Sequence, residues 1–155
     1  MPASIQVSVT DQPIKTIDAY SAFEAQCGDD DGAIAHFCGR CRSEDGALRA
    51  LELEHYPGMA EAQIEAICKS ASQKWPISRI EVTHRFGLVN VGEPIVLVFA
   101  SSAHREAALA GVQFVMDFLK TDAPFWKREH LADGSKGEWV AAKSRDEQVR
   151  DRWDS

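Results

Sequence analysis

The sequence predicts an α+β fold in which a mainly antiparallel sheet is combined with three main helices. Three observations support this prediction. Segments that alternate with a period of two are interleaved with longer amphipathic segments. Several alternating segments follow one another across short turns, as the strands of hairpins do. No strand–helix–strand unit repeats along the chain, which argues against a doubly wound parallel sheet.

The N-terminal part is expected to contain three strands and one helix. Ile5–Val9 alternates apolar and polar residues and predicts a strand. Thr16–Cys27 predicts a short helix, because its first residue can cap it and Gly28 suits the position after its end. After a turn rich in aspartate, Ala33–Phe37 predicts a second strand. Ala50–Tyr56 predicts a third strand, which is expected to pair with the second in antiparallel orientation.

The middle of the chain predicts a long helix followed by two strands. The helix is expected to begin at the Pro-Gly pair after the third strand and to end before Pro76. Its apolar stripe consists of Ala60, Ile64, Ile67, Ala71 and Trp75. Arg79–Phe86 alternates again, which places His84 on the apolar face of a strand. A turn over Gly87–Pro94 then leads to Ile95–Ala100, an apolar run typical of a buried strand.

A third main helix and two further elements are expected in the C-terminal part. The helix is expected to have Ser101 or Ser102 as its cap and to run to about Lys120. It should be largely buried, because its apolar residues include Ala108, Val112, Phe114, Val115, Phe118 and Leu119. Glu138–Ala142 predicts a last strand. Ser144–Glu147 has the pattern of a capping box and predicts a polar helix.

The composition is that of one soluble globular domain. The chain has 155 residues, of which 45% are hydrophobic and 26% charged, so we expect residues 1–155 to form a single domain. The net charge of −7 argues against nucleic acid as a partner, because nucleic-acid binding needs a basic surface. No signal peptide and no membrane span is recognisable, so we expect a cytoplasmic protein with reduced cysteines.

The most informative segment has two lysines, Lys120 and Lys127, on either side of a proline and two aromatic residues. The preceding Gly111–Leu119 is almost wholly apolar, and Phe125 and Trp126 also prefer burial. An ammonium group held against apolar surface loses hydration, which makes it useful as an acid, a base or a nucleophile. The alternative is that apolar stems are covered while the charged ends stay in water.

A second candidate site lies where the third helix is expected to begin. His104 and Arg105 are cations at a helix N-terminus, where the helix dipole opposes them. The same position suits an anion such as phosphate, although both side chains could also point into solvent. A helix from Ser102 to Lys120 is about 27 Å long. Either the site therefore spans a subunit boundary, or the two ends of the helix have different roles.

Other residues give weaker indications. Arg42 follows the second strand and is a candidate anion ligand or an exposed loop arginine. Cys38 and Cys41 form a C-x-x-C pattern, but no second pair completes a zinc site and the pattern does not open a helix. His84 and Arg85 are neighbours on a strand, so one should reach the core or a pocket and the other solvent. No motif for nucleotides or serine hydrolysis occurs, and we expect no metal and no cofactor.

A series of short stretches runs through almost the whole chain and is similar to a known family. The stretches are Phe37-x-Gly39-x-x-Arg42, Leu53-Glu-His-Tyr-Pro-Gly-Met-Ala60, His84-Arg-x-Gly87, Gly92-Glu93, Ser102-Ala-His-Arg105, Leu119-Lys-Thr-x-Ala-Pro-Phe-Trp-Lys-Arg-Glu129 and Gly137-x-Trp139. Together they resemble the large, catalytic subunit of molybdopterin synthase. The lysine segment and the Ala-His-Arg stretch are the most specific parts of this resemblance.

The resemblance implies an α/β-hammerhead fold and a homodimer of this chain that binds two small ubiquitin-like subunits, giving a heterotetramer. The Gly-Gly C-terminus of the small subunit carries a thiocarboxylate. Its sulfur is transferred to cyclic pyranopterin monophosphate, which forms the dithiolene of molybdopterin for molybdenum cofactor biosynthesis. Lys120 and Lys127 match the catalytic lysines of the family. The residues that match its substrate-binding positions are Phe37, Arg42, His104, Arg105 and Met116.

Two positions depart from the pattern of this family. Cys41 stands where the family usually has a hydrophobic residue, and the connection Ser43–Gly46 is short. The shape of the pocket on that side is therefore expected to differ. Two other functions stay open, namely a binding module that docks a ubiquitin-like partner without turnover, and a C-x-x-C redox or zinc protein.

Overall fold

Two β-sheets and three α-helices make up the part of the chain that the computed structural model describes, residues 2–122 and 125–141. In chain order the elements are β1 (Ser4–Thr10), α1 (Thr16–Ala25), β2 (Ala33–Arg40), β3 (Leu48–His55), α2 (Met59–Lys74), β4 (Ile77–Arg85), β5 (Gly87–Asn90), β6 (Pro94–Ser102), α3 (Arg105–Asp122) and β7 (Phe125–Leu131). One sheet has the strand order β1-β4-β6-β2 and the other β5-β3-β7. Among these strands β1 and β4 pair in parallel and the other pairs are antiparallel, which confirms the predicted α+β class.

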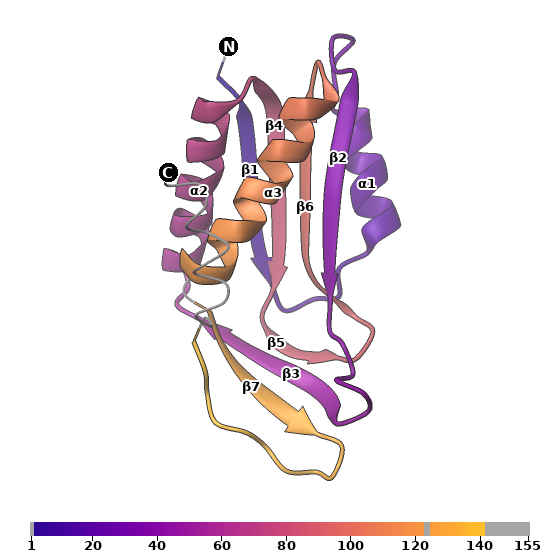
Figure 1. Ribbon diagram of the computed structural model, residues 1–155, viewed down its shortest axis with the longest axis vertical. Coiled ribbons are helices and arrows are strands. Elements are labelled where there is room, and N and C mark those ends of the chain that lie inside the picture. The colour runs from indigo at the N-terminus through magenta and orange to yellow at the C-terminus, as the bar shows by residue number, and fades with distance from the viewer. Residues whose placement is uncertain (1, 123–124, 142–155) are drawn as a thin grey trace.

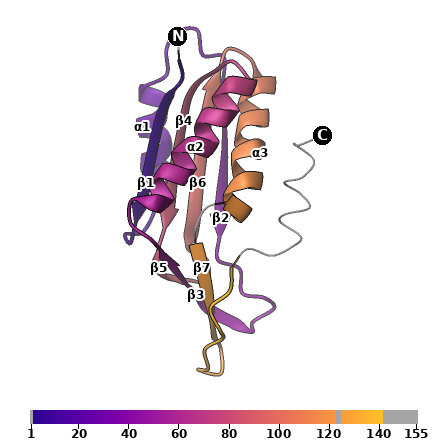
Figure 2. The ribbon, with the colours of Figure 1, turned by 90° about the vertical axis from the view of Figure 1, so that its left-hand side faces the viewer.

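Helices cover both faces of the four-stranded sheet. α2 and α3 lie side by side on one face, and α1 lies on the other (Figures 1 and 2). The main core fills the space between the sheet and α2 and α3, where Ile64, Ile80 and Val98 are fully buried. A smaller core lies under α1, where the rings of Phe23 and Phe99 stack 4.9 Å apart.

The three-stranded sheet crosses the end of the four-stranded sheet (Figure 1). The chain passes from β2 to β3 through Glu44 and Asp45, which have left-handed φ angles of 53° and 57°. It passes from β4 to β5 at Gly87, where φ is 82°. Two sharp turns therefore carry the chain from one sheet to the other, and a third hydrophobic cluster of Cys41, Leu48, Leu53 and Val89 lies at this junction.

The predicted pairing of the second and third strands is wrong. β2 pairs with β6, with Phe37 opposite Val98, while β3 pairs with β5 and β7. The register of β2 shifts between Gly39 and Arg40, where the chain begins to leave the first sheet. The predicted turn over Gly87–Pro94 likewise contains β5, because its backbone pairs with β3.

The C-terminal strand was also predicted at the wrong place. The part of the lysine segment from Phe125 onward belongs to β7, which pairs with β3 along its length. Within Glu138–Ala142, Val140 forms an isolated bridge with Lys127. Residue 142 and the capping box Ser144–Glu147 lie outside the described residues.

Helix positions were predicted better than helix starts. The buried stripes of α2 and α3 are confirmed. Thr16 is the first residue of α1 and caps nothing, and the helix ends at Ala25 without a left-handed residue at Gly28. Ser101 and Ser102 belong to β6, where the Ser102 hydroxyl donates a hydrogen bond to the Pro76 carbonyl at 2.9 Å. No helix of the described part of the chain is long and apolar enough to cross a membrane.

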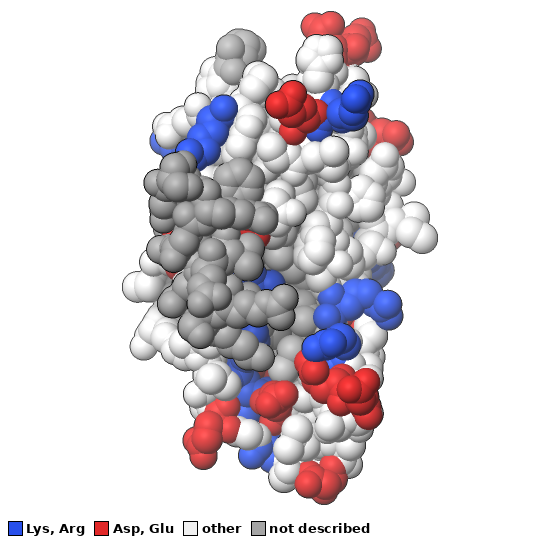
Figure 3. Space-filling model, in the orientation of Figure 1, with Lys and Arg blue, Asp and Glu red and all other residues white. Residues whose placement is uncertain are grey.

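A shallow groove, called the α3–β2 groove below, runs between α3 and β2. Its lining includes Phe37, which is 41% exposed, and Leu109, which is 60% exposed. Figure 3 shows a largely uncharged surface over α3 and β2, with charged side chains gathered near the end of β2. β2 is an outer strand of its sheet, so its free edge is unpaired among the described residues. An exposed edge beside apolar side chains is typical of a contact surface.

Two isoleucines on helices test where the core lies. Ile64 on α2 is fully buried, whereas Ile17 on α1 is 80% exposed. Ile64→Ala is expected to lower the free energy of unfolding by about 2–5 kcal/mol, because it removes buried methyl groups and leaves a cavity. Ile17→Ala should change it by less than about 0.5 kcal/mol. Urea denaturation measures both, and similar losses would contradict the placement of the core.

Candidate active site

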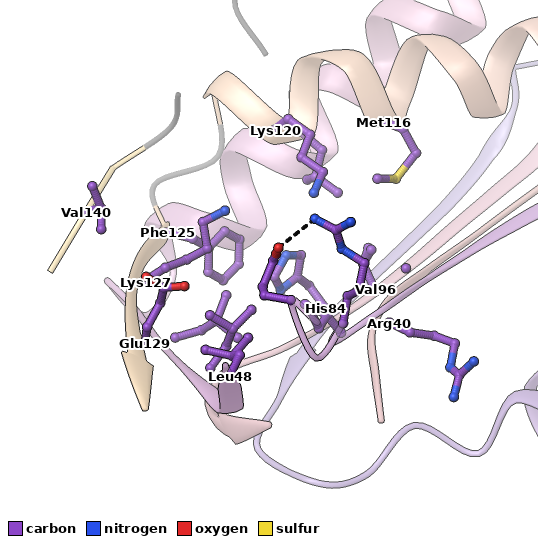
Figure 4. Close-up of a pocket in the computed structure, with 17 residues that line it drawn as sticks. Arg40, Leu48, His84, Val96, Met116, Lys120, Phe125, Lys127, Glu129 and Val140 are labelled. Atoms are coloured by element: carbon purple, nitrogen blue, oxygen red, sulfur yellow. Dashed lines mark hydrogen bonds and ion pairs between the residues drawn. The ribbon is translucent and has the colours of Figure 1, made fainter. Parts of the chain in front are cut away.

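A cavity of about 270 Å³ lies where the two sheets meet the C-terminal half of α3 (Figure 4). Its wall combines basic, acidic and apolar side chains from both sheets and from α3. The basic ones are Arg40, Arg42, His84, Lys120 and Lys127, and the acidic ones are Glu44 and Glu129. The apolar ones are Leu48, Leu51, Leu53, Ile95, Val96, Met116, Leu119, Phe125 and Val140.

The two lysines reach the cavity from different elements. Lys120 lies in the last turn of α3, where a cation suits the negative end of the helix dipole. Lys127 lies on β7, and alternation along this strand places it on the same side as Phe125 and Glu129. Lys127 is half-buried, whereas Lys120 is exposed. The expected burial is therefore correct in part for Lys127 and wrong for Lys120, because the last turn of α3 opens to the cavity.

His84 forms part of the cavity wall at the end of β4. Its ring stacks on the ring of Phe125, with centroids 3.9 Å apart and planes 14° apart. Its Nδ1 lies 2.8 Å from the carbonyl oxygen of Arg85. Burial, with added contributions from the positive charges of Lys120, His55 and Lys127, lowers the pKa of His84 from 6.5 to about 4, although the hydrogen bond to the Arg85 carbonyl acts in the opposite direction. His84 is therefore neutral at physiological pH.

Arg42 already has an anionic partner in the cavity. Its guanidinium donates to the carboxylate of Glu44 at 2.8 Å, which is the dashed contact in Figure 4. The two side chains are 80% and 47% exposed. An exposed pair of this kind contributes less than about 1 kcal/mol, so a bound anion could replace Glu44.

The structure brings together four of the seven predicted site residues. Lys120, Lys127, Arg42 and Met116 line the cavity. Phe37 lines the neighbouring α3–β2 groove, which Met116 and Lys120 also reach.

The other two predicted residues lie far from this cavity. Arg105 is the first residue of α3 and His104 precedes it, and the 15 residues from Arg105 to Lys120 correspond to about 22 Å along the helix axis. A long separation, as expected from the sequence, is thus present within the chain.

Four residues of the cavity with ionisable side chains had not been singled out as site residues from the sequence. These are His84, Arg40, Glu44 and Glu129. Alternation placed His84 on an apolar face, but it could not show that this face ends at a cavity. One of His84 and Arg85 was expected in solvent, but both are buried, because β5 turns back over Arg85. Its guanidinium donates to the Leu88 carbonyl at 3.1 Å and pairs with the Glu93 carboxylate at 3.4 Å.

The two cysteines of the C-x-x-C pattern lie in different surroundings. Cys38 packs against the cluster under α1, whereas Cys41 is buried in the cluster at the junction of the sheets. Burial raises the pKa of both thiols, which disfavours the thiolate that redox and metal chemistry require. Within residues 2–122 and 125–141, no group of three or more His, Cys, Asp or Glu side chains could hold a metal ion.

The free energy of unfolding is expected to fall as the pH drops from about 6.5 to about 4. In this window His84 binds a proton in the unfolded chain but stays neutral in the folded chain, so protons favour the unfolded state. The difference in pKa corresponds to about 3 kcal/mol. Urea titrations at pH 7.5 and 4.5 measure this loss. His84→Asn should lose less stability over the same interval, and an equal loss would show that another group is responsible.

Comparison with known proteins places the chain in a family. A family model described as MoaE protein matches residues 9–122. The molybdopterin synthase catalytic subunit of Brucella melitensis is 57% identical over 123 residues, which cover 79% of this chain and 76% of the relative. The subunit of the same name from Escherichia coli (strain K12) is 40% identical over 153 residues, covering 97% of this chain and 99% of the relative.

The fold agrees with a solved structure from the same family. The molybdopterin cofactor biosynthesis protein E of Burkholderia multivorans matches with a TM-score of 0.82 and 38% sequence identity, over 98% of each chain. The matched region includes both sheets, α3 and the cavity between them. By family model, sequence identity and fold, this chain belongs to the MoaE protein family, which includes the molybdopterin synthase catalytic subunits.

Proposed function

We propose that this chain transfers sulfur from the C-terminal thiocarboxylate of a small ubiquitin-like subunit to cyclic pyranopterin monophosphate, forming the dithiolene of molybdopterin. The observation that carries the proposal is the convergence of Lys120, Lys127 and Arg42 on one cavity. Lys120 and Lys127 come from the consecutive elements α3 and β7, and Arg42 comes from the β2–β3 connection, which lies far earlier in the sequence. The name of the curated relatives, a catalytic subunit, supports an enzyme that works with at least one further subunit.

The charges of the cavity suit two anions. Thiocarboxylate and phosphate are both negative, and the chain as a whole has a net charge of −7. An acidic protein needs a local group of cations to bring two anions together. Lys120, Lys127, Arg40 and Arg42 supply such a group within one wall. The exposed carboxylate of Glu44 keeps Arg42 in place until a ligand anion replaces it.

The proposed chemistry needs cations and proton transfer in the same place. The thiocarboxylate sulfur forms a bond to a side-chain carbon of the substrate while a carbon–oxygen bond at that carbon breaks, and a protonated lysine stabilises or protonates the departing oxygen. The tail is then attached to the substrate through a thioester. Water then cleaves this link, the tail leaves as a carboxylate, and a second tail repeats the cycle. One lysine accepts the proton that the water loses, and the other stabilises charge on the acyl oxygen. We assign Lys120 to the incoming tail and Lys127 to the pterin.

We further propose that two copies of this chain form a homodimer through the α3–β2 groove. The exposed Phe37 and Leu109 and the free edge of β2 supply a surface that a second copy would cover. A two-fold axis near the middle of α3 would pack two α3 helices in antiparallel orientation. Arg105 of the second copy would then lie level with the C-terminal turn that carries Lys120. This arrangement gives His104 and Arg105 a role at the cavity despite their distance within one chain.

Lysine substitutions test the assignment of the catalytic residues. Lys120→Ala and Lys127→Ala are each expected to lower the rate of molybdopterin formation by about 100-fold or more, because a proton-transfer group is lost. The assay supplies thiocarboxylated small subunit and cyclic pyranopterin monophosphate. Lys69→Ala, on the exposed side of α2, is the matched control and should keep full activity. Near-normal turnover by Lys120→Ala would contradict the assignment.

The same assay on the wild-type chain separates an enzyme from a binding module. Binding of the small subunit without any product would show a docking protein that has kept the fold. Product formation at a rate that depends on both lysines would establish the transferase.

Mixing two inactive variants tests whether the site spans two chains. Lys120→Ala and Arg105→Ala should each be nearly inactive alone. In a mixed dimer one cavity would carry both substitutions and the other would carry neither. An equal mixture after subunit exchange is therefore expected to recover about a quarter of the wild-type activity. A mixture that stays inactive, although exchange is verified by mass spectrometry, would place Arg105 and Lys120 in separate functions.

A further inference from the structure

The wall of the cavity contains a hydrogen-bond acceptor that the proposed reaction leaves unused. His84 is only 7% exposed, and its ring belongs to the cavity lining beside Phe125 (Figure 4). Among the described residues, no group lies within hydrogen-bond distance of its Nε2, yet this atom is not sealed inside the core. Nε2 therefore keeps access to the cavity, and none of the described residues is its hydrogen-bond partner there. A buried polar atom in this position is expected to pair with a ligand.

The contact of Nδ1 determines which form of the ring faces the cavity. The Arg85 carbonyl oxygen, 2.8 Å from Nδ1, can only accept a hydrogen bond. Nδ1 must therefore carry the proton, and Nε2 of the neutral ring has a lone pair. Stacking on Phe125 holds the ring plane in place. The protein thus presents a single acceptor with a fixed direction.

The surroundings keep this acceptor neutral. Groups with charge face His84 from every element around it, namely Lys120 on α3, Lys127 and Glu129 on β7, His55 on β3, Arg42 and Glu44 on the β2–β3 connection, and Arg85 on its own strand. Burial is the main cause that holds its pKa near 4, and the nearby lysine and histidine charges add to it. A neutral Nε2 repels an anion and attracts an N–H or O–H donor. Nε2 therefore binds hydrogen-bond donors, whereas the lysines and arginines of the same wall bind anions.

We propose that Nε2 of His84 accepts a hydrogen bond from the peptide N–H of the last glycine of the sulfur-carrying tail. This inference rests on the proposed function, which brings the tail to the two lysines. The terminal glycine carries its N–H one carbon away from its anionic group, so a site for this residue needs a cation and an acceptor side by side. The cavity supplies both, with Lys120 as the cation assigned to the tail and His84 as the acceptor. His84 then selects the orientation of the tail and directs its anionic end to Lys120.

A pair of synthetic peptides tests the proposal without requiring turnover. One peptide ends in Gly-Gly with a free carboxylate, and the other replaces the last glycine by glycolate, so that an ester oxygen stands in place of the N–H. The ester is expected to bind the wild-type chain about 5–30-fold more weakly, because a buried acceptor loses its donor. Isothermal titration calorimetry measures the dissociation constants.

His84→Asn and His55→Asn form a matched pair of variants. Asparagine at position 84 can still donate to the Arg85 carbonyl but has no acceptor at the place of Nε2. It should bind the two peptides within about 2-fold of each other. His55 also stacks on Phe125 but is not part of the cavity wall, so His55→Asn should keep the wild-type preference for the amide. Equal discrimination by His84→Asn and the wild-type chain would overturn the proposal.

Nitrogen-15 NMR of the wild-type ring gives a second measurement that does not depend on a variant folding. The Nδ1-protonated form is expected in the free protein, and the amide peptide should shift the Nε2 resonance while the ester should not. A ring protonated at Nε2 would overturn the proposal. If neither peptide binds, the tail does not enter this cavity, and the premise fails together with the proposal. If molybdopterin forms but the amide and ester bind equally, only the role of His84 fails.

Discussion

Close packing of α3 on the four-stranded sheet determines where the cavity lies. A Cβ atom at Gly111 would stand 2.6 Å from Cδ1 of Ile77, so the helix backbone packs closely against the side chain of this β4 residue. The neighbouring Ala107 and Ala108 are also small and buried. This contact determines where the axis of α3 lies on the sheet. The position of the axis in turn determines where Lys120 lies, because Lys120 is in the last turn of this helix. The crossing of the second sheet then places Lys127 opposite it.

The cavity combines strong positive charge with one neutral acceptor, and burial produces this difference. Lys120 and Arg42 are exposed enough to stay hydrated. His84 is buried in the same wall and loses hydration, which lowers its pKa. The same wall can thus hold anionic groups at its rim and a donor group at its base. Cations alone would attract the same anions but would not determine the orientation of the bound ligand.

The spacing of apolar residues in the sequence was sufficient to predict the buried faces of individual helices and strands. The apolar stripes of α2 and α3, and the inward position of Ile80, Val82 and His84, followed from spacing alone. Strand pairing was not predictable in this way, because β3 meets β7 across a long sequence separation and not its neighbour β2. The lysines were found because two charges beside Phe125 and Trp126 are unusual. His84 was placed on the apolar face of its strand but not among the site residues, because a sequence pattern shows which face is apolar but not where that face borders a cavity.

The pairing of β3 with β7 has a consequence for the order in which this protein is made. Glu52 on β3 accepts a hydrogen bond from Arg128 on β7, 76 residues later in the chain. At a synthesis rate of about 5–20 residues per second, β3 is made roughly 4–15 s before its partner strand. During this time one edge of β3 is open to wrong partners. The cavity is therefore completed late in biosynthesis, because the wall that contains Lys127 forms only after β7 has been made.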